Sequence, residues 1–138
     1  MRGQPREEGQ RWLEQARIDL KWGRHLNEQG APYLGCFLAQ QAAEKALKAV
    51  LYASGDELVV GHSVRQLGQR AAEVDARFGQ QLDEWSVLDT FYIPTRYPNG
   101  LPGDIPARVY SRQAGQTALT LAEAVLTAVD GWFGDAGA

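Results

Sequence analysis

Arg96 and Tyr97 are the residues of this sequence best suited to bind a ligand. They lie in an irregular segment, residues 93–105, which holds three prolines and two glycines and is closed by Pro106. An arginine fork on a proline-braced segment suits phosphate recognition, and a neighbouring aromatic ring can stack on a base. The alternative is that Arg96 pairs with an acid on a helix and fixes the segment, with Tyr97 as a packing residue.

A second polar group lies between residues 41 and 48. Glu44 and Lys48 are one helical turn apart, which predicts an ion pair contributing about 0.2–0.5 kcal/mol. With Gln41 and Lys45 they form one face of a helix, and we expect that face to be solvated or to lie between two subunits. If it lies opposite Arg96, then Lys48 and Arg96 would flank one anionic group.

Asp19 interrupts the apolar stripe of the first predicted helix, beside Leu20. A buried or half-buried carboxylate needs a partner, because an unpaired charge is costly away from water. We expect this partner to be Arg96 or Lys48. The role of Asp19 is then structural pairing rather than catalysis.

The chain contains two histidines, His25 and His62, and one cysteine, Cys36. His62 precedes Ser63, and we expect its imidazole to hydrogen-bond the loop before a helix; the alternative is a base brought near Arg96 by folding. His25 is expected at the surface. Two distant histidines do not have the spacing of metal ligands, so neither a metal nor a cofactor is predicted. Cys36 is expected to be a small buried apolar residue.

Helices must position these residues. Apolar side chains recur at a spacing of three to four residues over most of the chain, with Gly30 and Gly55 as helix ends and Ser63 with Gln66 as a capping box. We predict an all-α protein, an up-and-down bundle of about five helices with a Pro/Gly-rich loop before the last one. The expected helices cover residues of about 7–29, 32–54, 64–77, 82–92 and 107–133.

Length and charge limit the class of protein. The 138 residues predict a single domain, residues 1–138, with an ordered core of about 7–133 and loose ends over the first seven or so and last four residues. A net charge of −3 argues against a broad basic surface for nucleic acid. The polar N-terminus MRGQPREEGQ and the lack of a long apolar stretch predict a cytoplasmic protein without a secretory signal or membrane span.

Several short motifs occur in a recognisable order. The run from Gly35 to Ala49 reads GCFLAQQAAEKALKA, the first helix contains Ala16-x-x-Asp19-Leu20, and His62-Ser63 and Arg96-Tyr97-Pro98 follow. Over roughly residues 10–130 this order resembles the HEPN domain family. The resemblance implies a helical bundle that forms homodimers, binds a minimal nucleotidyltransferase and associates with a nucleotide or RNA. It also implies a two-component, toxin–antitoxin-like system, and the four tryptophans would fit a subunit interface.

The chain departs from the family at one point. Members that cleave RNA carry a histidine four to six residues after the arginine, whereas positions 100–102 here are Gly, Leu and Pro. Neither Arg108 nor Arg112 is followed by a suitable histidine. Three hypotheses therefore stand: a module that binds a partner and a nucleotide or RNA, a metal-independent endoribonuclease using Arg96 with a displaced base such as His62, and a non-catalytic oligomerising scaffold.

Overall fold

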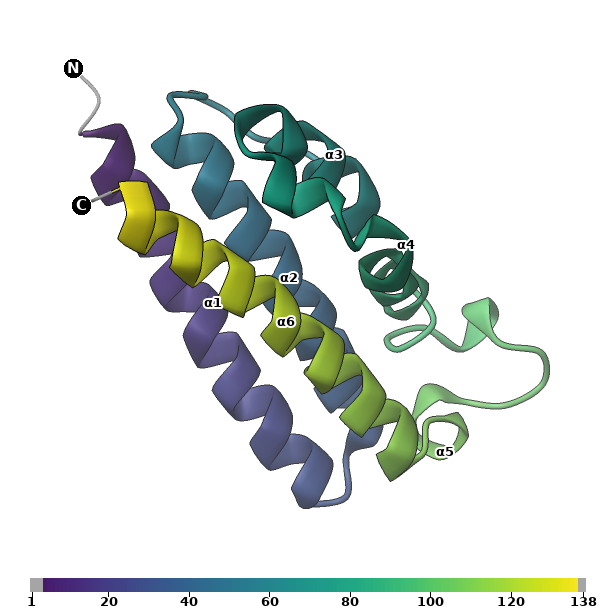
Figure 1. Cartoon of the computed structure of the whole chain (residues 1–138). Helices are drawn as coiled ribbons and strands as arrows, with labels where there is room; N and C mark the ends of the chain where they lie inside the picture. The colour runs from purple at the N-terminus through teal and green to yellow at the C-terminus, as the bar shows by residue number, and fades with distance from the viewer. Residues whose placement is uncertain (1–3, 137–138) are drawn as a thin grey trace.

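A computed structural model of the chain describes residues 4–136, and within this range every regular element is a helix (Figure 1). The predicted all-α helical fold is confirmed. None of the helices in this range is long and apolar enough to cross a membrane. The α-helices are α1 (Pro5–Glu28), α2 (Pro32–Ala53), α3 (Val64–Val74), α4 (Leu82–Trp85), α5 (Pro106–Val109) and α6 (Arg112–Ala136), and the 3₁₀ helices are η1 (Ala76–Gly79), η2 (Ser86–Phe91) and η3 (Pro98–Gly100).

The ends of the chain are more helical than expected. Helix α1 begins at Pro5 and α6 continues to Ala136. Both helices therefore enter the segments that we expected to be loose. The remaining parts of those segments, residues 1–3 and 137–138, lie outside the described residues.

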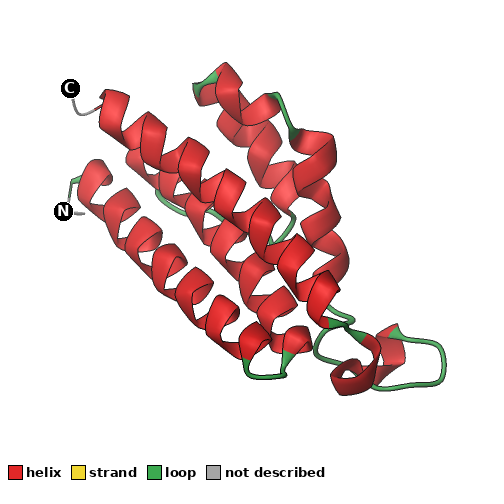
Figure 2. Ribbon diagram, turned by 60° about the horizontal axis from the view of Figure 1, so that its bottom comes forward, coloured by secondary structure: helices red, strands yellow, loops and turns green. Residues whose placement is uncertain are grey.

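Helix α2 is the central element of the bundle. It packs against α1 and α6 on one side and against α3 and η2 on the other (Figures 1 and 2). A helix in this position needs small or apolar side chains on nearly all sides. The sequence supplies them as five fully buried alanines, Ala39, Ala42, Ala43, Ala46 and Ala49.

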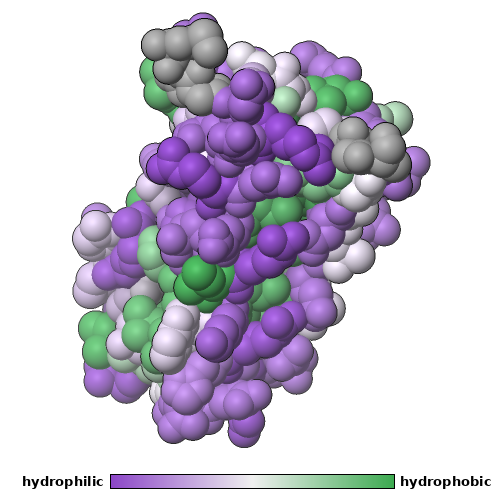
Figure 3. All heavy atoms as spheres, turned by 90° about the vertical axis from the view of Figure 1, so that its left-hand side faces the viewer, coloured by the Kyte–Doolittle hydropathy of each residue, from purple (hydrophilic) through white to green (hydrophobic). Residues whose placement is uncertain are grey.

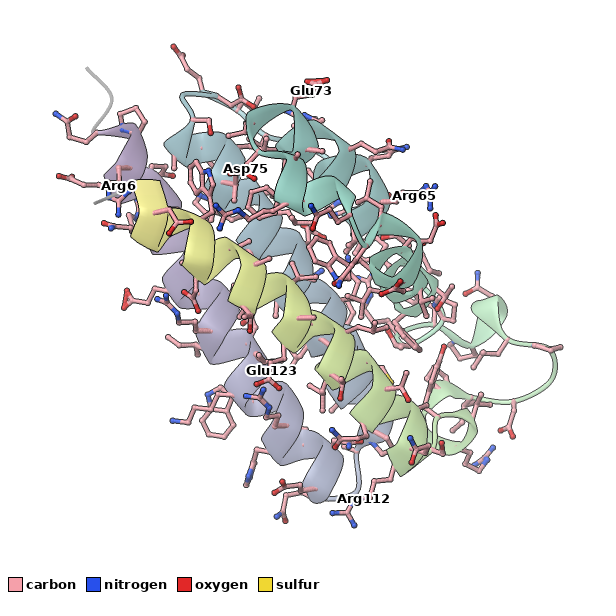
Figure 4. The ribbon with its side chains drawn as sticks, viewed as in Figure 1. Arg6, Arg65, Glu73, Asp75, Arg112 and Glu123 are labelled. Carbon is pink, nitrogen blue, oxygen red and sulfur yellow. The ribbon has the colours of Figure 1, made fainter. Side chains whose placement is uncertain are left out.

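Helices α1 and α2 form the predicted antiparallel hairpin. Gly30 ends α1 with a φ of 93°, and Gly55 follows α2 with a φ of 110°, values that glycine adopts without the strain of other residues. Helix α6 returns alongside α1, so that the end of α6 lies beside the start of α1. Arg6 connects the two ends by donating from Nη2 to the carbonyl oxygen of Phe133 at 3.0 Å (Figure 4).

The long helices approach closely where glycine replaces a larger side chain. A Cβ atom on Gly9 of α1 would lie 2.6 Å from the carbonyl oxygen of Ala49. A Cβ atom on Gly115 of α6 would lie 2.0 Å from Oδ1 of Asn27. A side chain at Gly9 would therefore push α1 away from α2, whereas one at Gly115 would displace the side chain of Asn27.

The start of α3 is held by a carboxylate from a distant part of the chain. Ser63 Oγ accepts from the Gln66 N–H at 3.1 Å, which is half of the predicted capping box. The remaining bonds involve Asp89 of η2, which accepts from the Val64 N–H at 2.6 Å and from the Ser63 hydroxyl at 2.9 Å. This capping ties η2 to α3 and fixes the residues that follow η2.

The last three predicted helices differ in detail. The third ends at Val74, because Asp75 is extended and its side chain accepts from the Arg77 N–H at 2.9 Å to start η1. The fourth is one α-turn that continues as η2. The fifth breaks at Tyr110, and Ser111 Oγ then accepts from the N–H of Ala114 at 3.1 Å to begin α6.

Cys36 is completely buried in α2, as predicted. Burial raises the pKa of its thiol to about 12, because the low-dielectric interior disfavours the thiolate. The thiol is therefore protonated at neutral pH and has little nucleophilic character.

Candidate functional site

Glu44 of α2 has its carboxylate inside the bundle and is only 4% exposed. Its Oε2 accepts from Lys48 Nζ at 3.0 Å, and its Oε1 accepts from Gln40 Nε2 at 3.2 Å. Lys48 is 6% exposed. The predicted ion pair is therefore confirmed, but the expectation of a solvated or intersubunit position for it is wrong, since α2 is covered by other helices of the same chain.

His62 lies on the connector before α3 and is joined to this buried group. Its Nδ1 is 3.3 Å from each carboxylate oxygen of Glu44, and its carbonyl oxygen accepts from Gln40 Nε2 at 2.9 Å. The imidazole stacks on the ring of Tyr92, with centroids 4.6 Å apart and an interplanar angle of 18°. The ring thus faces Glu44 rather than the loop that we expected it to bind. Its side chain remains 57% exposed.

Arg96 lies among three aromatic rings. Its Cζ atom is 4.4 Å from the ring centroid of Tyr92, 4.6 Å from that of Phe37 and 5.1 Å from that of Tyr97. Nε donates to the carbonyl oxygen of Tyr92 at 2.9 Å. The guanidinium is oriented by cation–π contacts and one backbone hydrogen bond, and its two terminal nitrogens make no hydrogen bond within residues 4–136.

The alternative for Arg96 required an acidic partner on a helix. In the described part of the chain, no carboxylate oxygen lies within 4.0 Å of its side-chain nitrogens. The other arginine near the loop, Arg108, does have a partner, since its Nε is 3.0 Å from Asp104 Oδ1. The Ile105 N–H and the Arg108 guanidinium hold the pKa of Asp104 below its ordinary value. The positive charge of Arg96 is therefore not paired with a carboxylate, whereas that of Arg108 is paired with Asp104.

Tyr92 brings His62 and Arg96 together. The Tyr92 centroid is 4.6 Å from the His62 centroid and 4.4 Å from Arg96 Cζ, so these two groups cannot be more than about 9 Å apart. This separation allows both to act on a single phosphate group, which a separation well beyond about 10 Å would prevent. Tyr97 lies at the edge of the site and is 49% exposed, so part of its ring is accessible to a flat ligand.

The expected partner of Asp19 is wrong. Asp19 is bound by Lys45 across the helix hairpin, at 2.5 Å from Nζ to Oδ2, and by Gln15 Nε2 at 2.9 Å. Lys48 is turned toward Glu44, and Arg96 is held by aromatic rings instead. Asp19 therefore ties α1 to α2 and makes no contact with the group around Arg96. His25 is exposed, as predicted.

Three residues of the site were missed in the sequence. Gln40 is completely buried and hydrogen-bonds both Glu44 and the connector. Phe37 and Tyr92 supply the rings that hold Arg96. The spacing of Phe37, Gln40 and Glu44 places them on one face of α2, so helical periodicity was a signal for two of the three. Nothing local indicated Tyr92.

The arrangement can bind an anion and position an acid–base group. The free guanidinium nitrogens suit a phosphate, and the exposed part of the His62 ring is accessible to a ligand bound there. Among residues 4–136, no three His, Cys, Asp or Glu side chains lie together in a way that could hold a metal ion.

Comparisons with known proteins agree with the motifs. Residues 10–132 match the HEPN domain family. The solved structure of TT1696 from Thermus thermophilus is 40% identical in sequence, with a TM-score of 0.83 over 89% of this chain and 96% of that one. The solved structure of ST0689, an archaeal HEPN homologue, is 30% identical, with a TM-score of 0.75 over 91% of this chain and 98% of that one. No curated protein matches the sequence.

Burial of the Glu44–Lys48 pair predicts a strong and non-additive effect on stability. We expect Glu44→Leu alone to lower the free energy of unfolding by about 3–5 kcal/mol, because it leaves the Lys48 ammonium buried without its partner. The double variant Glu44→Leu with Lys48→Met should recover much of that loss, since no buried charge remains. Urea unfolding of the parent, both single variants and the double variant measures the coupling. Additive losses would contradict a buried, interacting pair.

Proposed function

Because this chain belongs to the HEPN domain family, we propose that it is the helical module of a two-component, toxin–antitoxin-like system. In this proposal it binds a minimal nucleotidyltransferase and presents Arg96 to a phosphate group of a nucleotide or RNA. The partner comes from the family resemblance. The position of the ligand comes from the geometry around Arg96.

The observation that carries the proposal is that the Arg96 side chain is held in one orientation while its charge is unpaired. Its guanidinium is fixed by three rings and a backbone carbonyl, yet has no carboxylate partner in the described residues. A cation that serves only to hold a loop would gain more from an acid than from rings. A pre-oriented guanidinium with free terminal nitrogens next to the partly exposed ring of Tyr97 supports recognition of a phosphate with an adjoining base.

The surroundings of Arg96 limit the kind of nucleic acid that fits. The net charge is −3, and the neighbouring Arg108 is balanced by Asp104. Binding of a long duplex depends on many cation–phosphate contacts. One available arginine therefore favours a single nucleotide or a short single strand.

The surface near Arg96 also suits a protein partner. Ile93, Ile105 and Val109 are exposed around the same loop, and exposed apolar groups next to a polar site are typical of interfaces. We propose that the nucleotidyltransferase docks here. Its active site would then lie close to a ligand held by Arg96.

Substitution of Arg96 should weaken binding of a short RNA oligonucleotide. We expect Arg96→Ala to raise the dissociation constant roughly 10- to 100-fold, the effect of losing a hydrogen bond to a charged group. Arg96→Lys should recover only part of the affinity, because lysine lacks the planar fork. Fluorescence anisotropy over a salt series measures both, and one phosphate contact predicts a log–log slope of about −0.7. Arg108→Ala is the control; equal losses for Arg96→Ala and Arg108→Ala would contradict a specific site.

The gene adjacent to that of this protein is expected to encode a minimal nucleotidyltransferase, and the two proteins should co-purify when expressed together.

A negative charge introduced by Ile93→Asp into the proposed docking surface should reduce the amount of recovered partner about tenfold or more, because binding would bury an unpaired carboxylate. The same change at an exposed residue of α3, Val74→Asp, should have little effect. Tagged protein that retrieves only itself would refute the partnership.

The Glu44–His62 contact favours a second candidate function, metal-independent cleavage of RNA. Glu44 faces Nδ1 of His62, the ring is partly exposed, and Arg96 is within about 9 Å by way of Tyr92. A histidine oriented by a carboxylate can accept the proton of an attacking 2′-hydroxyl, while an arginine stabilises the charge on the phosphorane. His62 would replace the histidine that is missing after Arg96.

Cleavage in the presence of a chelator tests this candidate. We expect His62→Ala and Arg96→Ala each to lower the cleavage rate by about 100-fold or more, since one removes the base and the other the cation. The other histidine provides a matched control, and His25→Ala should cleave at the parent rate. Cleavage that survives both site substitutions would come from a contaminant or another site, and the catalytic candidate would be rejected.

A further inference from the structure

The connector between α2 and α3 contains a short segment with the side-chain pattern of a β-strand. Leu58 and Val60 are 75% and 66% exposed, whereas Val59 between them is 4% exposed. In a strand, successive side chains point to opposite faces, so this alternation indicates extended backbone. Leu58 and Val60 are the most exposed large apolar side chains within residues 4–136.

Tyr52 of α2 determines which edge of this segment is free. Its hydroxyl oxygen accepts from the Val59 N–H at 3.1 Å, so the Val59 N–H is turned toward α2. Successive N–H and C=O groups of extended backbone alternate between the two edges, so those of Leu58 and Val60 point away from α2. In the described part of the chain, these four groups make no hydrogen bond. They form a short strand edge that lacks a neighbouring strand.

A hollow of about 560 Å³ lies close to this edge and is lined by α1 and by Lys45 of α2. Trp12 forms part of its wall and stacks on Tyr52, with ring centroids 5.0 Å apart. Since Tyr52 also binds Val59, direct contacts connect the hollow to the connector. Figure 3 views the α1 side of the molecule, where hydrophobic atoms lie among polar ones. An aromatic wall with polar neighbours suits a large apolar or aromatic side chain.

The charges along this surface are unbalanced. Its basic side chains are each paired with an acid, in the pairs Arg11–Glu8, Lys45–Asp19 and Arg70–Asp56. Glu14 lines the hollow and Glu57 precedes Leu58; both are exposed, and neither forms an ion pair within residues 4–136. A ligand that covers the hollow and the connector therefore meets uncompensated negative charge and gains from carrying positive charge.

We propose that this surface binds an extended basic segment of another protein by β-strand addition. The backbone of the segment pairs with the free N–H and C=O groups of Leu58 and Val60. One of its large apolar side chains enters the hollow beside Trp12, and its lysine or arginine side chains lie near Glu57 and Glu14. In this mode of recognition, backbone pairing supplies affinity and the side-chain pocket supplies specificity.

The connector of a second copy of this chain does not have the required chemistry. Residues 56–62 read DELVVGH, with two acids and no lysine or arginine. Two such segments side by side would place like charges together, which is repulsive. The charge of the surface therefore favours a basic segment from a different protein.

This surface is separate from the function proposed above. None of Phe37, Tyr92 and Arg96 lines the hollow. The loop after η2 and α5 lie at the end of the bundle opposite the start of the connector (Figure 1). Binding at the connector requires neither a nucleotide nor the nucleotidyltransferase. Failure of either of those interactions would leave this proposal intact, and the reverse also holds.

A synthetic peptide tests the chemistry of the ligand. The probe is a fluorescein-labelled peptide of about nine residues, in which lysine alternates with valine around a central phenylalanine. By fluorescence anisotropy, replacing its lysines with glutamates should weaken binding about tenfold or more, and replacing phenylalanine with alanine about fivefold. N-methylation of the peptide nitrogens on the paired edge should abolish binding, because it removes the donors. Equal affinity of the lysine and glutamate peptides, or full affinity after N-methylation on either edge, would overturn the proposal.

The protein supplies the matched test of position. We expect Glu57→Lys to weaken binding of the lysine peptide about fivefold, since it reverses an exposed charge beside the edge. Glu28→Lys makes the same change at the other end of α1 and should keep the affinity within about twofold. Circular dichroism checks that both variants are folded. Equal losses for the two variants would contradict binding at the connector.

Amide hydrogen exchange followed by NMR tests the backbone pairing in the unaltered protein. Saturating peptide should slow exchange of the Leu58 and Val60 amides about tenfold or more, because both become hydrogen-bonded. The Val59 amide already donates to Tyr52, so its exchange should change little. No binding of the lysine peptide up to about 1 mM, or binding without protection of Leu58 and Val60, would refute strand addition.

Discussion

A carboxylate inside the central helix is the constraint on which the site depends. Glu44 lies in α2, the element that contacts helices on both sides. An isolated charge there would be strongly unfavourable, so donors must converge on it. Lys48 and Gln40 come from α2 itself, while His62 comes from the connector. Holding Glu44 therefore determines where the connector runs.

The position of the connector then determines the position of the aromatic residues. Tyr92 stacks on His62, and it follows η2, which is anchored to the start of α3 by Asp89. Arg96 lies four residues further along, in the turn after η2, and its Nε donates to the carbonyl oxygen of Tyr92. A series of contacts therefore connects the buried carboxylate of Glu44, through His62 and Tyr92, to the guanidinium of Arg96. The proposed binding function relies on this pre-orientation, because little ordering is left for the ligand to impose.

The sequence alone determined the elements whose causes are local. The α1–α2 hairpin follows from periodicity and from Gly30 and Gly55, which end the two helices as predicted and have positive φ. The Glu44–Lys48 pair and the Ser63 cap also follow from spacing within one helix. The ordered motifs identified the family for the same reason, since each is a short run of residues.

Only the tertiary structure decided which distant groups meet. Asp19 binds Lys45 because α1 and α2 lie side by side, whereas the sequence favoured either of two other cations as its partner. Glu44 and Lys48 are buried rather than solvated because α2 is covered by α1 and α6 on one side and by α3 and η2 on the other. Tyr92 joins His62 to Arg96 because a carboxylate on η2 caps α3. Periodicity describes one helix at a time, whereas these contacts depend on how the helices pack against each other.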